Sequence, residues 1–329
     1  MKVMTYAEGI REGIRIRMKE DPNVLVFGED VGQFGGCFGV TAELYEEFSG
    51  KRIRDTPISE GAIIGTAVGA AATGLKPIAE LMFIDFITVG MDQLVNQAAK
   101  MRYMFGGKIS LPMVVRLPGG AGIRAAAQHS QSLEAWVAHV PGLKVVYPSN
   151  AADAAGMMLT AIDDDNPVIF LEHKAIYTVE GEVPDVIEPI PFGKARIAKE
   201  GSDVTIITYG KQVYDALAAA EALAADGINA EVMDLRSLYP LDKDAILESV
   251  KKTNKVVLVS EEAKRGSFIG EVAATIAEDF FYELDAPIVR VGALNTPVPF
   301  SPGLEDYVVP NDKDIVQAVK KLFLKFQEI

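Results

Sequence analysis

The chain has 329 residues, 49% of them hydrophobic, and its 46 acidic and 32 Lys or Arg side chains give a formal net charge of −14. That length is enough for about two domains with cores of their own. So acidic a balance argues against nucleic acid and anionic membranes as partners, because both would repel the chain, and it suits a basic protein partner.

Cys37 is the only cysteine, which excludes an intrachain disulfide and a thiolate cluster for zinc or iron–sulfur. The chain starts directly with a folded pattern, in which Thr5 and Glu8 form a capping box for a first helix. This start is unlike a signal or transit peptide, and no apolar run in the sequence is long enough to cross a bilayer. We therefore expect a cytoplasmic, reduced environment.

In the first half of the chain, short apolar runs rich in β-branched residues alternate with helical patterns. The runs predict strands at residues 24–27, 78–82, 113–117, 143–147 and 168–171. The helical patterns are residues 62–73, 91–104, 132–139 and 151–162. Continuous apolar strands between helices are typical of a parallel sheet that is covered on both faces.

The pattern breaks after residue 171, where Pro184, Pro189 and Pro191 stand among acidic residues and predict an extended linker. Strands are then predicted at residues 204–209, 230–235, 255–260 and 288–291, with helices at 213–225, 243–250 and 268–280. A final helix is capped by Asn311 and has an apolar stripe of Ile315, Val319, Leu322 and Phe326. The sequence thus predicts an α/β protein with two open, mostly parallel sheets: a domain at residues 1–180, a linker at 181–200 and a domain at 201–329.

Glu60 is the most informative acidic residue. It closes the run Asp55-Thr56-Pro57-Ile58-Ser59-Glu60 and begins an apolar helix. Desolvating a carboxylate at this place is costly, which indicates that a partner or ligand uses the charge. Gly61, Gly65 and Gly69 follow at four-residue spacing and leave a bare stripe that another backbone or a flat ligand can approach. A helix-start carboxylate beside a well-packed glycine helix explains the same residues, and from the residues alone both interpretations stay open.

Other candidate residues are also open to two interpretations. His129 lies after a glycine-rich loop and before a helix, where a histidine can transfer protons or simply hydrogen-bond the loop. Phe86 lies beyond the predicted strand 78–82, so it either stacks on a ring at the carboxyl edge of the sheet or belongs to the core. The acidic run 163–166 ends a helix and is either a solvated face or part of a cation site.

The sequence contains no Walker loop, nucleotide-binding glycine fingerprint or nucleophile elbow, which argues against a nicotinamide oxidoreductase and a serine hydrolase. Longer motifs carry a resemblance instead: Gly28-Glu29-Asp30-Val31, Asp55-Thr56-Pro57-Ile58-Ser59-Glu60, Arg102-Tyr103-Met104, Gln128-His129-Ser130-Gln131, Asp164-Asp165-Asn166-Pro167 and Asp234-Leu235-Arg236-Ser237-Leu238. With these motifs in order, essentially the whole chain resembles the beta subunit of the thiamine-diphosphate-dependent component of 2-oxo acid and acetoin dehydrogenase complexes.

The resemblance implies a pyrimidine-binding thiamine diphosphate fold followed by a transketolase-type C-terminal domain. It implies that Glu60 hydrogen-bonds the cofactor's aminopyrimidine ring, that Glu29 stands behind it, and that Phe86 stacks on the ring with Met82 close by. His129 is implied to steer protons or the incoming lipoyl group. The resemblance also implies a potassium ion near the end of this domain, held by Met113, Ala161, Ile162, Asp164 and Asn166.

The chain lacks the Gly-Asp-Gly motif that holds magnesium in this family. The resemblance therefore implies that an alpha subunit supplies the magnesium and diphosphate half of the site, in an alpha2beta2 heterotetramer that docks on a lipoyl acyltransferase core. Residues 79–86, 103–108, 124–129 and 295–302 are most similar to acetoin dehydrogenase, with pyruvate dehydrogenase next. Val89 stands where many pyruvate enzymes have glutamine. Branched-chain 2-oxo acids remain a third substrate class, and a non-catalytic scaffold subunit is the alternative of another kind.

Overall fold

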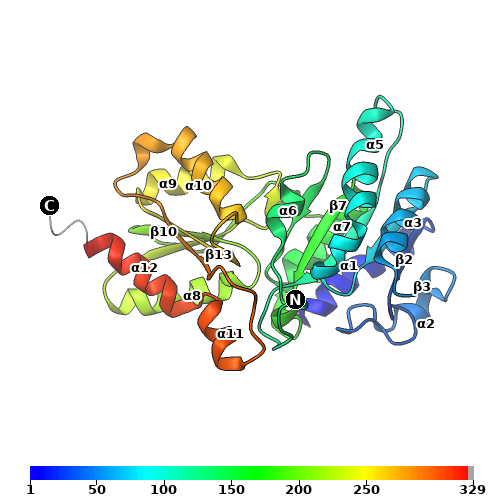
Figure 1. Ribbon diagram of the computed structural model, residues 1–329, viewed down its shortest axis with the longest axis horizontal. Coiled ribbons are helices and arrows are strands. Elements are labelled where there is room, and N and C mark those ends of the chain that lie inside the picture. Colours follow the sequence, from blue (N-terminus) through cyan, green and yellow to red (C-terminus); the bar gives the residue numbers. More distant parts are fainter. Residues whose placement is uncertain (325–329) are drawn as a thin grey trace. The chain divides into compact units, whose positions relative to one another are not determined.

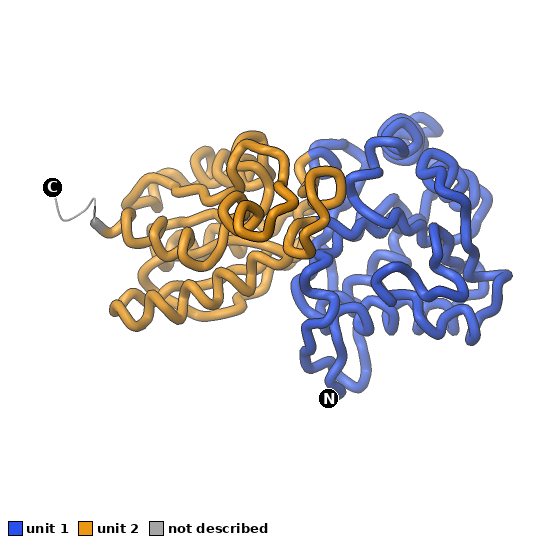
Figure 2. Tube along the Cα trace, turned by 60° about the horizontal axis from the view of Figure 1, so that its bottom comes forward, with its two compact units in different colours: residues 1–119, 136–192 blue, residues 120–135, 193–329 orange. Residues whose placement is uncertain are grey.

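Two units make up the part of the chain that the computed structural model describes, residues 1–324 (Figure 2). Unit 1 contains residues 1–119 and 136–192, and unit 2 contains residues 120–135 together with the chain from residue 193 onward. Residues 120–135, which the sequence places in the first domain, therefore group with unit 2. Neither unit has, within its described residues, a helix long and apolar enough to span a lipid bilayer.

A parallel sheet lies at the centre of unit 1, as the continuous apolar runs predict (Figure 1). Within this unit the strand order is β6-β7-β5-β4-β2-β3, and each neighbouring pair is parallel. The strands are β2 (Val24–Gly28), β3 (Ile53–Asp55), β4 (Lys76–Glu80), β5 (Val114–Gly119), β6 (Lys144–Val146) and β7 (Val168–His173). Nearly all side chains of β2, β4, β5 and β7 are buried, as expected for a sheet between layers of helices.

The first helix of unit 1 begins where its local sequence signal places it. Helix α1 (Tyr6–Glu20) starts with the predicted capping box, in which the Glu8 N–H donates to Thr5 Oγ1 at 3.2 Å and the Thr5 N–H donates to Glu8 at 2.7 Å. It packs against α7 (Ala151–Asp163), and a Cβ on Gly9 would lie 2.4 Å from the Ala151 carbonyl oxygen, so only glycine permits this approach. Unit 1 also contains α2 (Leu44–Phe48) and α3 (Glu60–Ala72), and α6 (Glu134–Ala138) crosses from unit 2 into unit 1.

The helix predicted at residues 91–104 differs in form. The chain instead forms α4 (Ile87–Met91), a π-helical stretch (Asp92–Ala98) and α5 (Ala99–Met104). A π-helical insertion changes the turn period, which apolar spacing in the sequence does not reveal.

Two short strands occupy parts of the stretch predicted as a linker, and the first begins at Glu180, one residue before it. β8 (Glu180–Val183) pairs antiparallel with β1 (Lys2–Thr5), and β9 (Arg196–Lys199) pairs antiparallel with β11 (Ala230–Asp234). Both linker strands are short and largely polar, so no buried face marks them in the sequence.

Unit 2 contains a five-stranded sheet in the order β14-β13-β10-β11-β9, parallel except for β9. Its other strands are β10 (Val204–Thr208), β13 (Val256–Ala263) and β14 (Val289–Ala293), and β12 (Ser237–Tyr239) lies outside it. Figure 1 shows α8 (Gln212–Ala225) and α12 (Asp312–Leu324) on one side of the sheet, with α9 (Lys243–Thr253) and α10 (Phe268–Asp279) on the other. Helix α11 (Pro302–Val308) precedes α12.

The apolar stripe of α12 is confirmed for the described residues. Ile315, Val319 and Leu322 join a core that includes Val257 and Val259 of β13, while the predicted Phe326 lies outside the described residues. Asn311 also caps the helix as expected, since its side-chain oxygen accepts the Lys313 N–H at 2.9 Å.

Candidate half-site for thiamine diphosphate

The four cofactor-binding residues that the sequence predicts in unit 1 follow the carboxyl ends of adjacent strands. Glu29 comes directly after β2, Glu60 is the first residue of α3 beyond β3, and Met82 and Phe86 come after β4. Because β3, β2 and β4 are neighbours in a parallel sheet, these residues share one edge of it. That edge is where open α/β sheets bind ligands.

Glu29 and Glu60 form a pair of interacting buried carboxylates. Glu29 is 7% exposed and Glu60 is 8% exposed. Burial raises the pKa of Glu29, and the charges of Glu60, Asp30 and Glu80 raise it further. Glu29 Oε1 is buried and has no hydrogen-bond partner in the described part of the chain. A buried carboxyl group with a raised pKa and an oxygen that lacks a partner suits a polar ligand that completes its hydrogen bonds.

The aromatic side of the half-site is formed by the residues after β4. Phe86 is half-buried, and its ring meets Phe83 edge-to-face with centroids 5.9 Å apart. Lys174 Nζ lies 4.9 Å from the Phe83 ring centroid, and Met82 Sδ lies 3.4 Å from Cys37 Sγ. Phe86 is therefore held by an aromatic neighbour while its ring stays partly accessible, as stacking on a flat ligand requires.

A buried charge network, which the sequence analysis missed, lies next to this half-site. Arg116 has no exposed surface, and its Nε and Nη2 donate to the Glu172 carboxylate at 2.6 and 2.7 Å. Its Nη1 donates to Glu80, and the Tyr177 hydroxyl donates to Glu172 at 2.6 Å. Burial raises the pKa of Glu80 although Arg116 lowers it. The signal in the sequence was a charged residue inside each of three apolar strands.

The aminopyrimidine ring fits these unit 1 residues. It needs a carboxylate at a ring nitrogen and an apolar face beside it, and the chain offers Glu60 with the unpartnered Glu29 oxygen, and Phe86 with Met82. Val89 borders the same place, because its carbonyl oxygen is 3.5 Å from where a Cβ on Gly61 would lie.

His129 belongs to unit 2. It is half-buried in the loop before α6, and its backbone N–H donates to the Ala126 carbonyl at 3.3 Å. The same loop is closed by the Gly120 N–H, which donates to the Gln131 carbonyl at 3.1 Å.

The side chains of the predicted potassium site already have protein partners. Asp164 pairs with Lys144 and accepts the Asn166 Nδ2–H at 2.9 Å, while Asn166 Oδ1 accepts from Arg102 at 3.1 Å. The Met113 carbonyl accepts the N–H of Val168 at 2.9 Å. Ala161 and Ile162 lie in the last turn of α7, where carbonyls lack intrahelical partners. The backbone oxygens are thus the part of this set that best fits a potassium ion.

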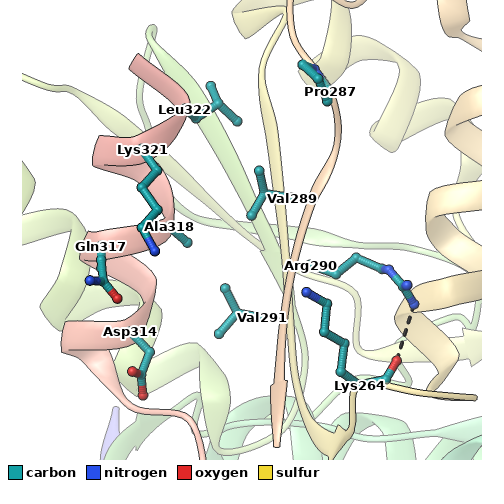
Figure 3. Close-up of a pocket in the computed structure, with 10 residues that line it drawn as sticks. All are labelled: Lys264, Pro287, Val289, Arg290, Val291, Asp314, Gln317, Ala318, Lys321 and Leu322. Carbon is teal, nitrogen blue, oxygen red and sulfur yellow. Dashed lines mark hydrogen bonds between the residues drawn. The ribbon is translucent and has the colours of Figure 1, made fainter. Parts of the chain in front are cut away.

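A separate hollow of about 330 Å³ lies on unit 2 beside β14 and α12 (Figure 3). Lys264, Arg290 and Lys321 line it around Val289 and Val291, and Arg290 Nη1 donates to the Lys264 carbonyl at 3.2 Å. No residue that the sequence assigns to thiamine diphosphate lines this hollow.

The fold and half-site define a class of thiamine-diphosphate-dependent proteins. Residues 2–179 match the family model described as "Transketolase, pyrimidine binding domain", and residues 193–315 match "Transketolase, C-terminal domain". The fold is similar to that of the solved "Split gene transketolase, inactive beta4 tetramer", with a TM-score of 0.81, 24% identity, and coverage of 97% of this chain and 98% of that one.

Curated relatives narrow this class to a family. The chain is 50% identical to "Acetoin:2,6-dichlorophenolindophenol oxidoreductase subunit beta" of Bacillus subtilis (strain 168), over 98% of this chain and 97% of the relative. It is 49% identical to "Pyruvate dehydrogenase E1 component subunit beta" of Rickettsia felis, over 97% of this chain and 98% of the relative. The chain belongs to the beta subunits of the thiamine-diphosphate-dependent dehydrogenase components of 2-oxo acid and acetoin dehydrogenase complexes.

Proposed function

We propose that this chain, together with an alpha subunit, cleaves acetoin, releases acetaldehyde, and passes the other two carbons as an acetyl group to oxidised lipoamide of an acyltransferase core, whose disulfide is reduced as it accepts the group. The observation that carries the proposal is the buried pair Glu29 and Glu60, beside Phe86, at the carboxyl edge of the unit 1 sheet. Bound thiamine diphosphate supplies the electron sink for cleavage of the carbon–carbon bond.

In this proposal Glu60 is the catalytic carboxylate. It accepts or donates the proton at the ring nitrogen of the aminopyrimidine, and its burial at the start of an apolar helix keeps water from that proton. Glu29, whose pKa is raised by burial and by the charge of Glu60, stands behind it as a second carboxyl group. Phe86 and Met82 hold the ring, and His129 steers protons or the lipoyl group.

An alpha subunit supplies the other half of the site. The chain has no Gly-Asp-Gly motif, so we assign the magnesium ligands and diphosphate contacts to that partner. We propose an alpha2beta2 heterotetramer in which the acidic chain, with a formal net charge of −14, docks a basic segment of the acyltransferase core. Residues 1–180 would bind the pyrimidine and residues 201–329 would form the transketolase-type domain, joined by residues 181–200.

The preference for acetoin rests on sequence similarity and on Val89. This side chain is 59% exposed and its backbone borders the start of α3, so it adds no polar partner for a substrate carboxylate. Pyruvate is the alternative substrate. Turnover of acetoin, pyruvate and a branched-chain 2-oxo acid by one purified alpha–beta preparation compares the substrates directly, and a Val89→Gln variant should shift preference toward pyruvate.

Potassium binding is a further proposal, with carbonyl oxygens of Met113, Ala161 and Ile162 as ligands and with Asp164 and Asn166 ordering the turn around them. Thermal unfolding of the beta chain in KCl and in NaCl at equal ionic strength tests it. Equal midpoints would contradict a specific potassium site.

The test of the catalytic assignment is Glu60→Gln in the reconstituted alpha–beta complex with thiamine diphosphate and magnesium. Removing a general acid–base group should lower kcat by about 10²- to 10⁴-fold. The matched control is Glu46→Gln, which changes an exposed carboxylate of the same unit. Calorimetric titration with the cofactor and sedimentation of the complex show whether binding and assembly are intact. Wild-type turnover by Glu60→Gln would refute the assignment.

A further inference from the structure

Backbone N–H groups of residues 120–135, here named the histidine segment because it carries His129, are held by carboxylates of distant residues. The Ala121 N–H donates to Glu261 and the Gly122 N–H donates to Glu305. At the other end, the Ala135 N–H donates to Glu262 Oε1 at 3.0 Å. All these residues belong to unit 2, so the anchors hold both ends of the segment to one body.

Two of the three anchoring carboxylates, Glu262 and Glu305, are buried. Glu262 is 4% exposed, and its Oε2 accepts the Tyr209 hydroxyl at 2.9 Å and the N–H of Phe268, the first residue of α10, at 2.8 Å. The partial positive charge at the start of that helix stabilises this carboxylate. Glu305 lies in α11 and is 1% exposed. Rigid elements therefore present the acceptors to the segment.

Glu305 is poorly compensated as an ion pair. Arg124, within the segment, contacts Asp306 at 2.7 Å and Glu305 at 3.6 Å. Glu305 Oε2 is buried without a hydrogen-bond partner in the described part of the chain. Burying a carboxylate carries a large desolvation cost, and partial pairing does not fully offset it. Stability alone thus explains the arrangement poorly, whereas directional hydrogen bonds to two consecutive amides fix a backbone position.

The segment between the anchors is closed on itself. The Gly120 N–H bonds to the Gln131 carbonyl, and Arg124 and Ala126 have left-handed φ values of +61° and +60°. Non-glycine residues adopt that conformation only when their surroundings impose it. The turn that carries His129 is therefore held in a conformation that the isolated segment would leave.

We propose that Glu261 and Glu305 are positioning residues that fix the histidine segment on unit 2 and so set the placement of His129 during turnover. This inference rests on the proposed role of His129. If this inference holds, β13 and α11 of unit 2 contribute to the reaction indirectly, because they provide the carboxylate acceptors that hold the segment with His129.

The experiment compares Glu261→Ala, Glu305→Ala and the corresponding Gln variants in the alpha–beta complex with thiamine diphosphate and magnesium. Gln keeps an oxygen acceptor without the charge. If the buried Glu305→Ala variant fails to fold, Glu305→Gln takes its place in the comparison. The matched controls are Glu271→Ala and Glu271→Gln, at an exposed carboxylate of unit 2. Hydrogen–deuterium exchange of peptides spanning 120–135 is measured beside kcat and KM.

In the Ala variants, the amides of Ala121 and Gly122 should exchange about tenfold or more faster, because a charge-assisted hydrogen bond is lost. The Gln variants should show a smaller increase and the controls none. We expect kcat to fall about tenfold with KM for the 2-oxo or acetoin substrate nearly unchanged, because the segment acts on proton or acyl transfer. The fall should disappear in a His129→Ala background.

Two results would overturn the inference. One is exchange in the Ala variants that equals the controls, and the other is a kcat loss that persists in full without His129. Failure of the proposed function looks different: the wild-type complex would turn over none of the substrates, while the exchange measurement would still report whether the carboxylates hold the segment.

Discussion

Replacing Arg116 with methionine should strongly destabilise unit 1. The side chain has no exposed surface and supplies three hydrogen bonds to Glu172 and Glu80, so Arg116→Met leaves two buried carboxylates without the cation that bonds them both. Removing one partner of a buried ion pair costs about 3–5 kcal/mol. At about 2–4 °C per kcal/mol for a unit of this size, the Tm should fall by roughly 6–20 °C.

The assay is thermal and urea unfolding of the purified chain at pH 7.5 and pH 5. Burial raises the pKa of Glu80, so the folded state binds this proton more tightly than the unfolded state. The stability gained from this protonation is fully present below the pKa of Glu80 in the unfolded chain and is lost as pH rises. The loss of unfolding free energy caused by Arg116→Met should therefore be smaller at pH 5 than at pH 7.5. The control Arg54→Met removes an exposed arginine and should stay within about 0.5 kcal/mol of wild type. If Arg116→Met matched this control, the network would not be a buried charge cluster.

Three further changes test other parts of the chain. Burial and the neighbouring Glu262 raise the pKa of Glu134 well above its usual range, so the protonated carboxyl stabilises the fold at low pH and this contribution is lost as pH rises. Glu134→Gln should therefore unfold at a higher temperature than wild type at pH 8. Near pH 4 the two proteins should unfold at the same temperature. A Cβ at Gly142, where φ is +105°, would lie 1.9 Å from the Ala99 carbonyl oxygen. Gly142→Ala should therefore lower the free energy of unfolding, measured by urea titration, by more than about 3 kcal/mol. Wild-type stability of this variant would contradict the packing. Burial and nearby carboxylates raise the pKa of Cys37, so iodoacetamide should modify it more slowly at pH 8 than a cysteine peptide, and Glu29→Gln should speed the reaction.

The main elements of the fold could be predicted because they are recorded locally. The capping box of Thr5 and Glu8 and the apolar stripe of α12 are spacings within a few residues, and the buried strands are continuous apolar runs. The π-helical stretch Asp92–Ala98 and the short strand β8 could not, since neither depends on apolar periodicity. The backbone hydrogen bonds of both segments depend on neighbouring elements rather than on a pattern in their own residues.

The grouping of the histidine segment with unit 2 has the same kind of explanation. Its anchors are 140 residues away at Glu261, 183 at Glu305 and 127 at Glu262. Each anchor is a single side chain bonded to a backbone N–H, so the segment's own sequence has no signal for its partner. The resemblance to a family assigned His129 a role, but only the structure connects that residue to β13 and α11.

Register explains why the charge network was missed and why it matters to the half-site. Glu80 is paired with Arg116 across β4 and β5, and Glu172 lies two residues beyond the partner of Arg116 on β7, so the pleat turns all three side chains to one face. Burial raises the pKa of Glu29, and the charge of Glu80 in this network raises it further. The network therefore acts on the half-site through Glu29, the carboxyl that lies behind the proposed proton-exchanging residue Glu60.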